Sequence, residues 1–375
     1  MAVNTPDASN ANIPNLAVVS LAAAEVTASH STNRADTFST PDVAAAGVPF
    51  DDRMWIDALD DPNHVYMEYH DFGTTSQIFV QRSDDGGLTY DNAANQAVDA
   101  TTEPSAGPPT GNIAGQIKVD HSSCPSHGNL YQIFVAPDNP NDNAKNSSNF
   151  INAAYVAVAS NVSLTTPTYI FKDYKIFSCG AGSTCASGLG LGNLFPALAV
   201  DNFGYLYAVW SDNTDIYYSY STTLGTTWSP AIRVTQGTTQ AGKSNVFPWV
   251  AADANGHVAI GWYGADAAGN SNTISATNTH WNVFVAESVN AHAGAPVFTL
   301  SQASDHSNHT GQISTGGLTG SSDRSLADFF QIAIDPNHRV NVAYADNHAG
   351  TSVTYFTRQK KTARGIVTKG QCARQ

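Results

Sequence analysis

Long apolar runs, basic residues and cysteines are all scarce in this chain of 375 residues. No stretch of about 18 or more apolar residues occurs, so we expect no membrane-spanning helix. Lysine and arginine number 17 against 31 aspartates and glutamates, for a formal net charge of -14. Because an acidic, lysine-poor surface attracts neither phosphate backbones nor anionic membranes, we exclude both as partners. Residues 1–10 show no signal-peptide pattern.

The four cysteines comprise one close pair and two distant residues. Cys179 and Cys185 bracket C-G-A-G-S-T-C, a loop that can bend back far enough for a disulfide. No histidine or third cysteine lies near it to complete a zinc site. We predict the Cys179–Cys185 disulfide, whereas pairing of Cys124 with Cys372 stays open. Disulfides favour a secreted or periplasmic location.

Short runs rich in valine, isoleucine and aromatic residues, separated by glycine, asparagine and serine, predict strands. Five segments share one plan: an apolar strand that ends in aspartate, a polar turn, and a second aromatic-rich strand. The five aspartates, 52 to 82 residues apart, are Asp57, Asp120, Asp201, Asp253 and Asp335. This spacing fits four-stranded propeller blades with loops of varied length. We expect each aspartate to hold its hairpin turn by accepting backbone hydrogen bonds.

The octapeptide S-D-D-G-G-L-T-Y at residues 83–90 follows a predicted strand and has two degraded copies. Residues 221–228 read S-T-T-L-G-T-T-W, and residues 31–38 read S-T-N-R-A-D-T-F. In such a turn the acid accepts amide hydrogen bonds, the glycine supplies positive φ, and the aromatic ring fills the space below. The expected structural residues are Ser83, Asp85, Gly87, Thr89 and Tyr90, and in the second copy Ser221, Gly225, Thr227 and Trp228.

These octapeptides resemble the Asp box of the sialidase (neuraminidase) superfamily. The F-P-x-h-A-x-D pattern around Phe195 and Phe247, and D-R-S-L-A-D-F-F-Q-I-A-I-D from Asp323, resemble the same bacterial sialidase-like repeat proteins. The resemblance covers nearly the whole chain from about Ser31. It implies an all-β fold: a single β-propeller of four-stranded antiparallel blades. Six blades follow most simply, with the termini meeting to close the ring, and a seventh is possible within residues 143–190.

The resemblance also implies how the chain is divided and where its site lies. Residues 1–375 would form one domain, with 1–50 as outer strands of the ring-closing blade and 51–375 as five further blades. Sialidases bind a substrate carboxylate where inner strands converge, with three arginines, and use a tyrosine nucleophile with glutamate and aspartate. The catalytic candidates are Glu68, Asp52 and Tyr263. The substrate-binding candidates are Arg53, Arg324, Asp328, His70 and Trp249.

Two functions stay open. The first is a secreted glycoside hydrolase that acts on a polar or anionic glycan in an axial pocket. The second is a non-catalytic propeller that binds a glycan or another protein, or an accessory subunit of an extracytoplasmic assembly. The second is favoured because Arg53 is followed by Met54 and Trp55 where sialidases have Ile-Pro, and because a third well-placed arginine is missing.

Histidines occur in D-H-S-N-H-T from Asp305 and at His70, His121 and His348. They lack the helical spacing of a metal motif, so no metal ion and no cofactor are predicted.

Overall fold

The computed structural model describes residues 2–3, 15–22, 25–46, 51–71, 73, 75, 77–91, 94–99, 112–138, 151–160, 169–180, 185, 187–192, 194–316, 323–326 and 329–374. For residues 2, 3, 51 and 52 it describes the backbone only. None of the described residues forms a helix long and apolar enough to cross a membrane.

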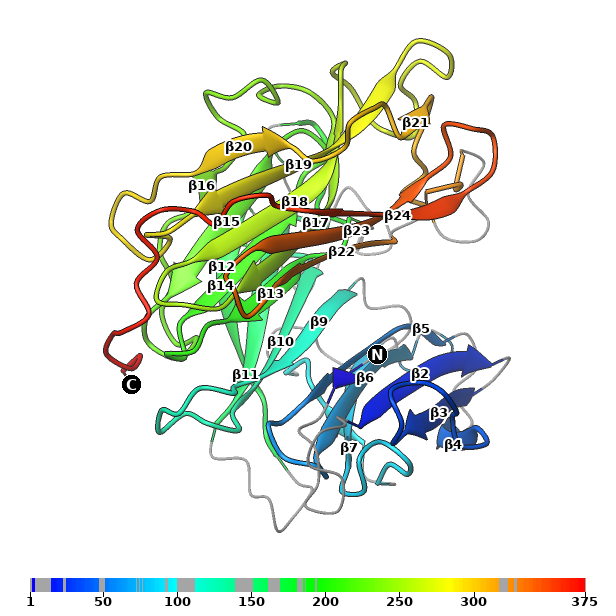
Figure 1. The fold of residues 1–375 in the computed structure, drawn as a ribbon, viewed down its shortest axis with the longest axis vertical. Helices are drawn as coiled ribbons and strands as arrows, with labels where there is room; N and C mark the ends of the chain where they lie inside the picture. The colour runs from blue at the N-terminus through cyan, green and yellow to red at the C-terminus, as the bar shows by residue number, and fades with distance from the viewer. Residues whose placement is uncertain are drawn as a thin grey trace.

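The first three antiparallel sheets, which we call blades 1 to 3, follow one another along the chain (Figure 1). Blade 1 comprises β1 (Ala2–Val3), β2 (Leu16–Ala22), β3 (Glu25–Ser31) and β4 (Asp42–Ala46). Blade 2 comprises β5 (Asp51–Ala58), β6 (Val65–Asp71), β7 (Gln77–Ser83) and β8 (Asn95–Gln96). Blade 3 comprises β9 (Ile113–Val119), β10 (Leu130–Ala136), β11 (Ala153–Ala159) and β12 (Lys172–Ser178). The region suspected of hiding a seventh blade thus supplies outer strands of blade 3.

Blades 4 to 6 continue the series. Blade 4 comprises β13 (Ala197–Val200), β14 (Leu206–Ser211), β15 (Ile216–Ser221) and β16 (Ile232–Arg233). Blade 5 comprises β17 (Asn245–Ala252), β18 (Val258–Ala265), β19 (His280–Ser288) and β20 (Thr299–Gln302), with β21 (His309–Thr310) also on β19. Blade 6 has three strands, β22 (Phe330–Ile334), β23 (Val340–Asp346) and β24 (Val353–Arg358). The all-β, six-bladed propeller is confirmed, and blade 6 has no fourth strand among the described residues.

Five apolar cores lie between successive blades. Each pairs side chains of one blade with those of the next: Val26 with Met67, Tyr66 with Ile117, Ile133 with Leu198, Tyr207 with Val250, and Tyr263 with Tyr344. No sixth core joins blade 6 to blade 1 among the described residues. In Figure 1, β22 to β24 face blades 1 and 2 across this seam. Burial between neighbours, rather than within one sheet, therefore holds the propeller together.

The repeated aspartates secure turns and also reach the next blade. Asp201 and Asp335 each accept two backbone amides of their own turns, at 2.8 to 3.1 Å, as expected. Asp57 is the exception, because its Oδ2 accepts the Val119 amide of blade 3 at 3.0 Å. In the turn after Asp57, Asp61 accepts the amides instead. Asp57 lies within β5, so its carboxylate cannot reach the amides of the following turn, whereas Asp201 and Asp335 stand at the start of their turns.

Asp253 begins a buried charge network between blades 5 and 6. Its Oδ1 lies 2.6 Å from His257 Nδ1, and its Oδ2 lies 2.5 Å from His338 Nδ1. The other nitrogen of His257 lies 2.9 Å from Glu287, which accepts a hydrogen bond from Gln359. Burial alone would lower the pKa of His257, but hydrogen bonds to the two carboxylates outweigh it and raise the pKa to about 9. His257 therefore acts as a cation between two carboxylates of blade 5, and these carboxylates in turn contact His338 and Gln359 of blade 6.

The three octapeptide turns share one hydrogen-bond pattern. Ser83 Oγ accepts the Gly87 amide at 2.8 Å, and Ser221 and Ser31 repeat this contact with the residue four positions on. Gly87 has φ of 90°, and a Cβ there would approach Ala17 of blade 1 to 2.5 Å. The third turn places Ala35 at φ of 69° where the other two have glycine. The serine thus preserves the turn where the aspartate or glycine has been lost.

Removal of the Asp85 carboxylate should destabilise the first octapeptide turn measurably. Its Oδ1 accepts the amides of Leu88 and Thr89 at 3.1 and 2.9 Å, and its Oδ2 accepts the Thr89 hydroxyl at 2.6 Å. Asp85→Ala should lower the free energy of unfolding by about 1–2 kcal/mol in urea denaturation. Asp85→Asn, which keeps one oxygen for the amides, should lose less than half of that. Equal losses would contradict amide capping as the source.

Both disulfides form, and the second fixes the C-terminal segment. The predicted Cys179–Cys185 bond is confirmed. Cys124 pairs with Cys372, and the Cα atoms of these two residues are 5.7 Å apart. The segment after β24 crosses the turns of blades 5 and 4, where the Asn255 amide donates to Val367 and the Ala373 amide donates to Phe203. It ends far from the N-terminus (Figure 1). The termini therefore do not meet to close the ring, because these contacts hold the C-terminal segment elsewhere.

Candidate functional site: an aromatic cleft at the seam

The inner strands of blades 2, 3 and 5 carry a β-bulge at the same position. The strand pairing skips residues 53–54 in β5, 115–116 in β9 and 247–248 in β17. Arg53 and Phe247 have φ of 63° and 54°, and Phe195, at the matching position of blade 4, has φ of 48°. A bulge redirects its side chain out of the strand's alternation. The bulges of these blades therefore turn the side chains at their positions toward the end of the propeller at which the inner strands begin.

The bulge side chains form a row across three blades. The Arg53 guanidinium lies 3.4 Å from the centre of the Phe195 ring, and that ring stacks on Phe247 at 5.8 Å. Blade 3 contributes Gly115 at its bulge, where a Cβ would approach the Pro196 carbonyl oxygen to 2.2 Å. A side chain there would collide with the backbone of blade 4, so only glycine fits.

Side chains fill the centre of the propeller. Trp55, Gln116, Phe195, Phe247, Trp249 and Phe330 surround a space of only about 10 Å³. That volume holds no sugar, so among the described residues this space does not provide the axial pocket expected from the sequence. The large aromatic residues of blades 2, 4, 5 and 6 fill it.

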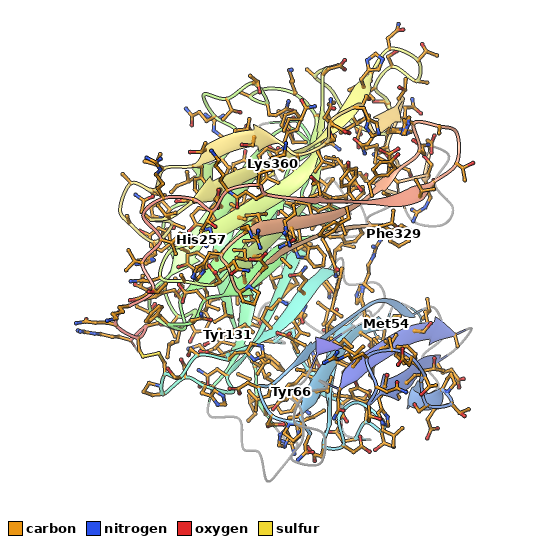
Figure 2. All side chains as sticks on the ribbon, viewed as in Figure 1. Met54, Tyr66, Tyr131, His257, Phe329 and Lys360 are labelled. Carbon is orange, nitrogen blue, oxygen red and sulfur yellow. A yellow bond between two sulfur atoms is a disulfide. The ribbon has the colours of Figure 1, made fainter. Side chains whose placement is uncertain are left out.

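A larger opening lies beside this plug, at the seam. It has a volume of about 330 Å³ and is lined by Trp55, Trp249, Phe329, Phe330, Gln331, Ala343, Tyr344 and Thr354. We call it the aromatic cleft. Trp55 of blade 2 meets Trp249 of blade 5 edge to face, with ring centres 5.2 Å apart. Phe329 is 71% exposed at the start of blade 6, and Met54 of β5 lies across from it (Figure 2).

Two of the predicted site residues have structural partners instead. The Tyr263 hydroxyl donates to the Phe329 carbonyl at 3.0 Å and accepts the Ala345 amide at 2.9 Å. A phenol fixed to the backbone of the next blade is not placed as a nucleophile. Arg324 donates to the carbonyl of Gly316. Together with the contact of Arg53 on Phe195, this means that the two arginines do not converge on one anion.

The remaining predicted residues divide into three groups. Trp249 lines the aromatic cleft. Glu68 and His70 are wholly buried in β6, and Glu68 is the cross-strand partner of Trp55, so both side chains extend from the same face of blade 2. Asp52 pairs with His70 through its backbone, and Asp328 lies outside the described residues.

Sequence reasoning misses most of the cleft. The residue pattern assigns Trp55, Phe329 and Phe330 to strands, and it does not reveal the bulges that turn side chains toward the axis. The available signal is the alignment of Trp55 with Trp249, each two residues after a bulge that begins with Arg53 or Phe247.

No family model and no curated protein matches this chain. A trans-sialidase of Ruminococcus gnavus shows 10% identity over 98% of this chain and 95% of its own, with a TM-score of 0.48. The Trypanosoma rangeli sialidase shows 10% identity over 96% of this chain and 54% of its own, with a TM-score of 0.47. A protein of unknown function from Dyadobacter fermentans shows 11% identity over 95% of this chain and 93% of its own, with a TM-score of 0.53. At such identities, the likeness to the last of these concerns the fold alone.

Proposed function

We propose that this chain is a glycan-binding β-propeller and that a sugar ring occupies the aromatic cleft. The observation that carries the proposal is the meeting of Trp55 and Trp249, from blades 2 and 5, at the wall of an open cavity of about 330 Å³. Tryptophan and phenylalanine present flat apolar faces on which the C–H face of a pyranose can stack. The volume lies at the lower end of the range for small-ligand sites.

The lining favours a neutral sugar over an anionic one. None of the described residues around the cleft is charged, and the polar groups are those of Gln331, Tyr344 and Thr354. A carboxylate buried there would lose its hydration without gaining a cation, which is costly. The cleft therefore suits a neutral hexose, whose hydroxyl groups need only neutral hydrogen-bond partners.

Glycoside hydrolysis is the second candidate, because Glu68 lies cross-strand from Trp55. A buried carboxyl beside a sugar site is the kind of group that acts as a general acid. In this version Glu68 and Asp52 keep their predicted catalytic roles and Arg53 and His70 adjoin the substrate. We propose an extracytoplasmic location, which the two disulfides support, and treat residues 1–375 as one domain distantly akin to sialidase-like propellers.

Exposed Phe329 provides a test that does not disturb the core. On a glycan array followed by calorimetric titration, we expect Phe329→Ala to weaken binding of the best glycan about tenfold. Phe356→Ala is the matched control: it is 67% exposed on β24 of the same blade but does not line the cleft, so affinity should not change. Absence of glycan binding by the wild-type protein, or equal losses in both variants, would overturn the proposal. Turnover of chromogenic glycosides that Glu68→Gln abolishes would establish the hydrolase.

A further inference from the structure

Two loops far apart in sequence bring His306, Asp346 and His348 together at one end of blades 5 and 6. His306 Nε2 lies 2.9 Å from an Asp346 oxygen and 3.0 Å from His348 Nδ1. His348 Nδ1 lies 2.5 Å from the other Asp346 oxygen. Two imidazole nitrogens and one carboxylate thus point at a common position, with the ligand atoms within 4.8 Å of one another.

These separations, from 2.5 to 3.0 Å, are somewhat shorter than the ligand-to-ligand distances around a small divalent ion, so the ligands need only move slightly apart to bind one. Ligand atoms bound to zinc at about 2.0–2.1 Å in a tetrahedron lie about 3.3 Å apart. His306 Nε2 and His348 Nδ1 lie 3.0 Å apart and each also contacts an Asp346 oxygen, so the three groups already face one another, as the ligands of one ion do. The mixture of two imidazoles and one carboxylate suits zinc and related transition metals, and disfavours calcium and magnesium.

A carboxylate outside the cluster orients one of its histidines, as is common around metal sites. The second nitrogen of His306 lies 2.6 Å from Asp305 Oδ1, and a carboxylate on the far nitrogen fixes a ligand imidazole in place. Asp346 is fully buried, while the side chains of His306 and His348 are 31% and 41% exposed. The charged ligand is therefore held rigidly, and an ion can enter from solvent past the histidines.

Hydrogen bonds between the two loops hold the cluster in place before any ion binds. The Asn347 amide donates to the Asn308 carbonyl at 3.0 Å, and His309 Nδ1 lies 2.7 Å from Asn347 Oδ1. The buried Asn308 side chain donates to the Ala345 carbonyl at 3.2 Å. Because the scaffold is already ordered, binding need not order the loops, which favours affinity.

The other group of this kind in the described residues, Asp253 with His257 and His338, is arranged differently. There the two imidazole rings are 6.3 Å apart, against 4.2 Å for His306 and His348, and the second nitrogen of His257 is held by Glu287. Each histidine Nδ1 contacts its own oxygen of Asp253, and His257 is fully buried. That group serves as an ion-pair network and as an internal control for the first.

We propose that His306 Nε2, His348 Nδ1 and an Asp346 carboxylate oxygen bind one zinc-class divalent cation. Three protein ligands leave at least one coordination position for water or for a ligand group. Tyr355 lies beside the cluster, with its ring centre 5.4 Å from that of His306, and lines a cavity of about 680 Å³ between blades 5 and 6 together with Asp305 and Tyr344. None of the three ligands lines the aromatic cleft, so the metal proposal does not depend on the glycan proposal.

The test uses the full chain stripped with chelator and titrated with zinc chloride. Calorimetry and elemental analysis after gel filtration should give one ion per chain. Cobalt(II) in place of zinc should give visible absorption bands typical of nitrogen and oxygen ligands. His348→Ala should weaken zinc binding at least about a hundredfold, and Asp305→Asn about tenfold, through the orientation of His306. His338→Ala in the other group should leave binding unchanged.

Several outcomes would overturn the proposal: no stoichiometric ion on the wild-type protein, unchanged affinity in His348→Ala, or loss of binding in His338→Ala. The exposure of His348 makes its substitution tolerable to the fold, and circular dichroism of that variant checks this. If His348→Ala is folded and has lost the ion, the site is assigned.

Discussion

Replacement of both Cys124 and Cys372 by serine should lower the free energy of unfolding by about 5 kcal/mol. The two cysteines are separated by 248 residues, so the bond between them removes far more freedom from the unfolded chain than a short-range bond does. Chemical denaturation followed by tryptophan fluorescence measures the loss. The C-terminal segment, which crosses the turns of blades 5 and 4 to reach Cys124 in blade 3, should also become susceptible to proteolysis under native conditions.

The second disulfide provides the control for loop length. Cys179 and Cys185 enclose only a short loop, with a separation of 6 residues. The same loop-closure relation gives about 2 kcal/mol for the double serine variant at these positions. Equal losses in the two double variants would contradict loop closure as the origin of the effect. A protected C-terminal segment without Cys124 and Cys372 would show that its hydrogen bonds alone suffice.

His257→Ala should lower the free energy of unfolding by about 3–5 kcal/mol near neutral pH, a large loss for a single substitution. It removes the cation between Asp253 and Glu287 and leaves two partly buried carboxylates of like charge facing each other. Figure 2 shows His257 at the opposite end of blade 5 from Phe329, so the loss should not affect glycan affinity of the folded protein directly. Urea denaturation at fixed pH measures it.

The stability that His257 contributes through the Asp253 network should depend on pH in a characteristic way. The folded pKa of His257 is raised to about 9 from an ordinary value of 6.5, so the histidine binds its proton more tightly in the folded state. Its stabilising contribution is therefore fully present below about pH 6.5 and is lost as pH rises through about 9. A shift of this size corresponds to about 3 kcal/mol. The gap between wild type and His257→Ala should narrow accordingly between these two pH values.

His280 provides the matched control for this experiment. It is half exposed and lies 2.9 Å from a single carboxylate, that of Asp266, on the same blade. An exposed pair of this kind contributes little, so His280→Ala should cost less than about 1 kcal/mol. A His257→Ala penalty that stays constant up to about pH 10 would mean that packing, and not charge, is the source.

The fold could be predicted because its signals are local. Asp201 and Asp335 begin their turns, Ser83 and Gly87 shape theirs, and the alternating apolar strands between them need no information from elsewhere in the chain. The repetition of these signals then gives the blades. The place of the C-terminal segment could not be foreseen, since nothing near Cys372 indicates that its partner is Cys124 of blade 3.

The candidate sites could be predicted only in part, because they depend on where distant segments meet. The prediction of Trp249 as a binding residue stands as a proposal, but the bulges at Arg53 and Phe247 that turn aromatic side chains to the axis leave no pattern in a single strand. His306 and His348 are 42 residues apart and lie in loops of different blades. No spacing rule joins them, which is why the sequence predicts no metal site.

The open seam has a mechanical consequence. The C-terminal segment spans blades 3 to 5 and is covalently anchored at Cys124, so it ties these blades together. Blade 2 contacts them through the core beside blade 3 and through Arg53 and Trp55, which meet Phe195 of blade 4 and Trp249 of blade 5. Within the described residues, no apolar core closes the ring between blades 6 and 1. Trp55 belongs to blade 2, whereas Trp249 and Phe329 belong to blades on the other side of the seam, so a sugar bound in the aromatic cleft, as we propose, would contact both sides. Under that proposal, binding should favour conformations in which the two sides of the seam lie close together.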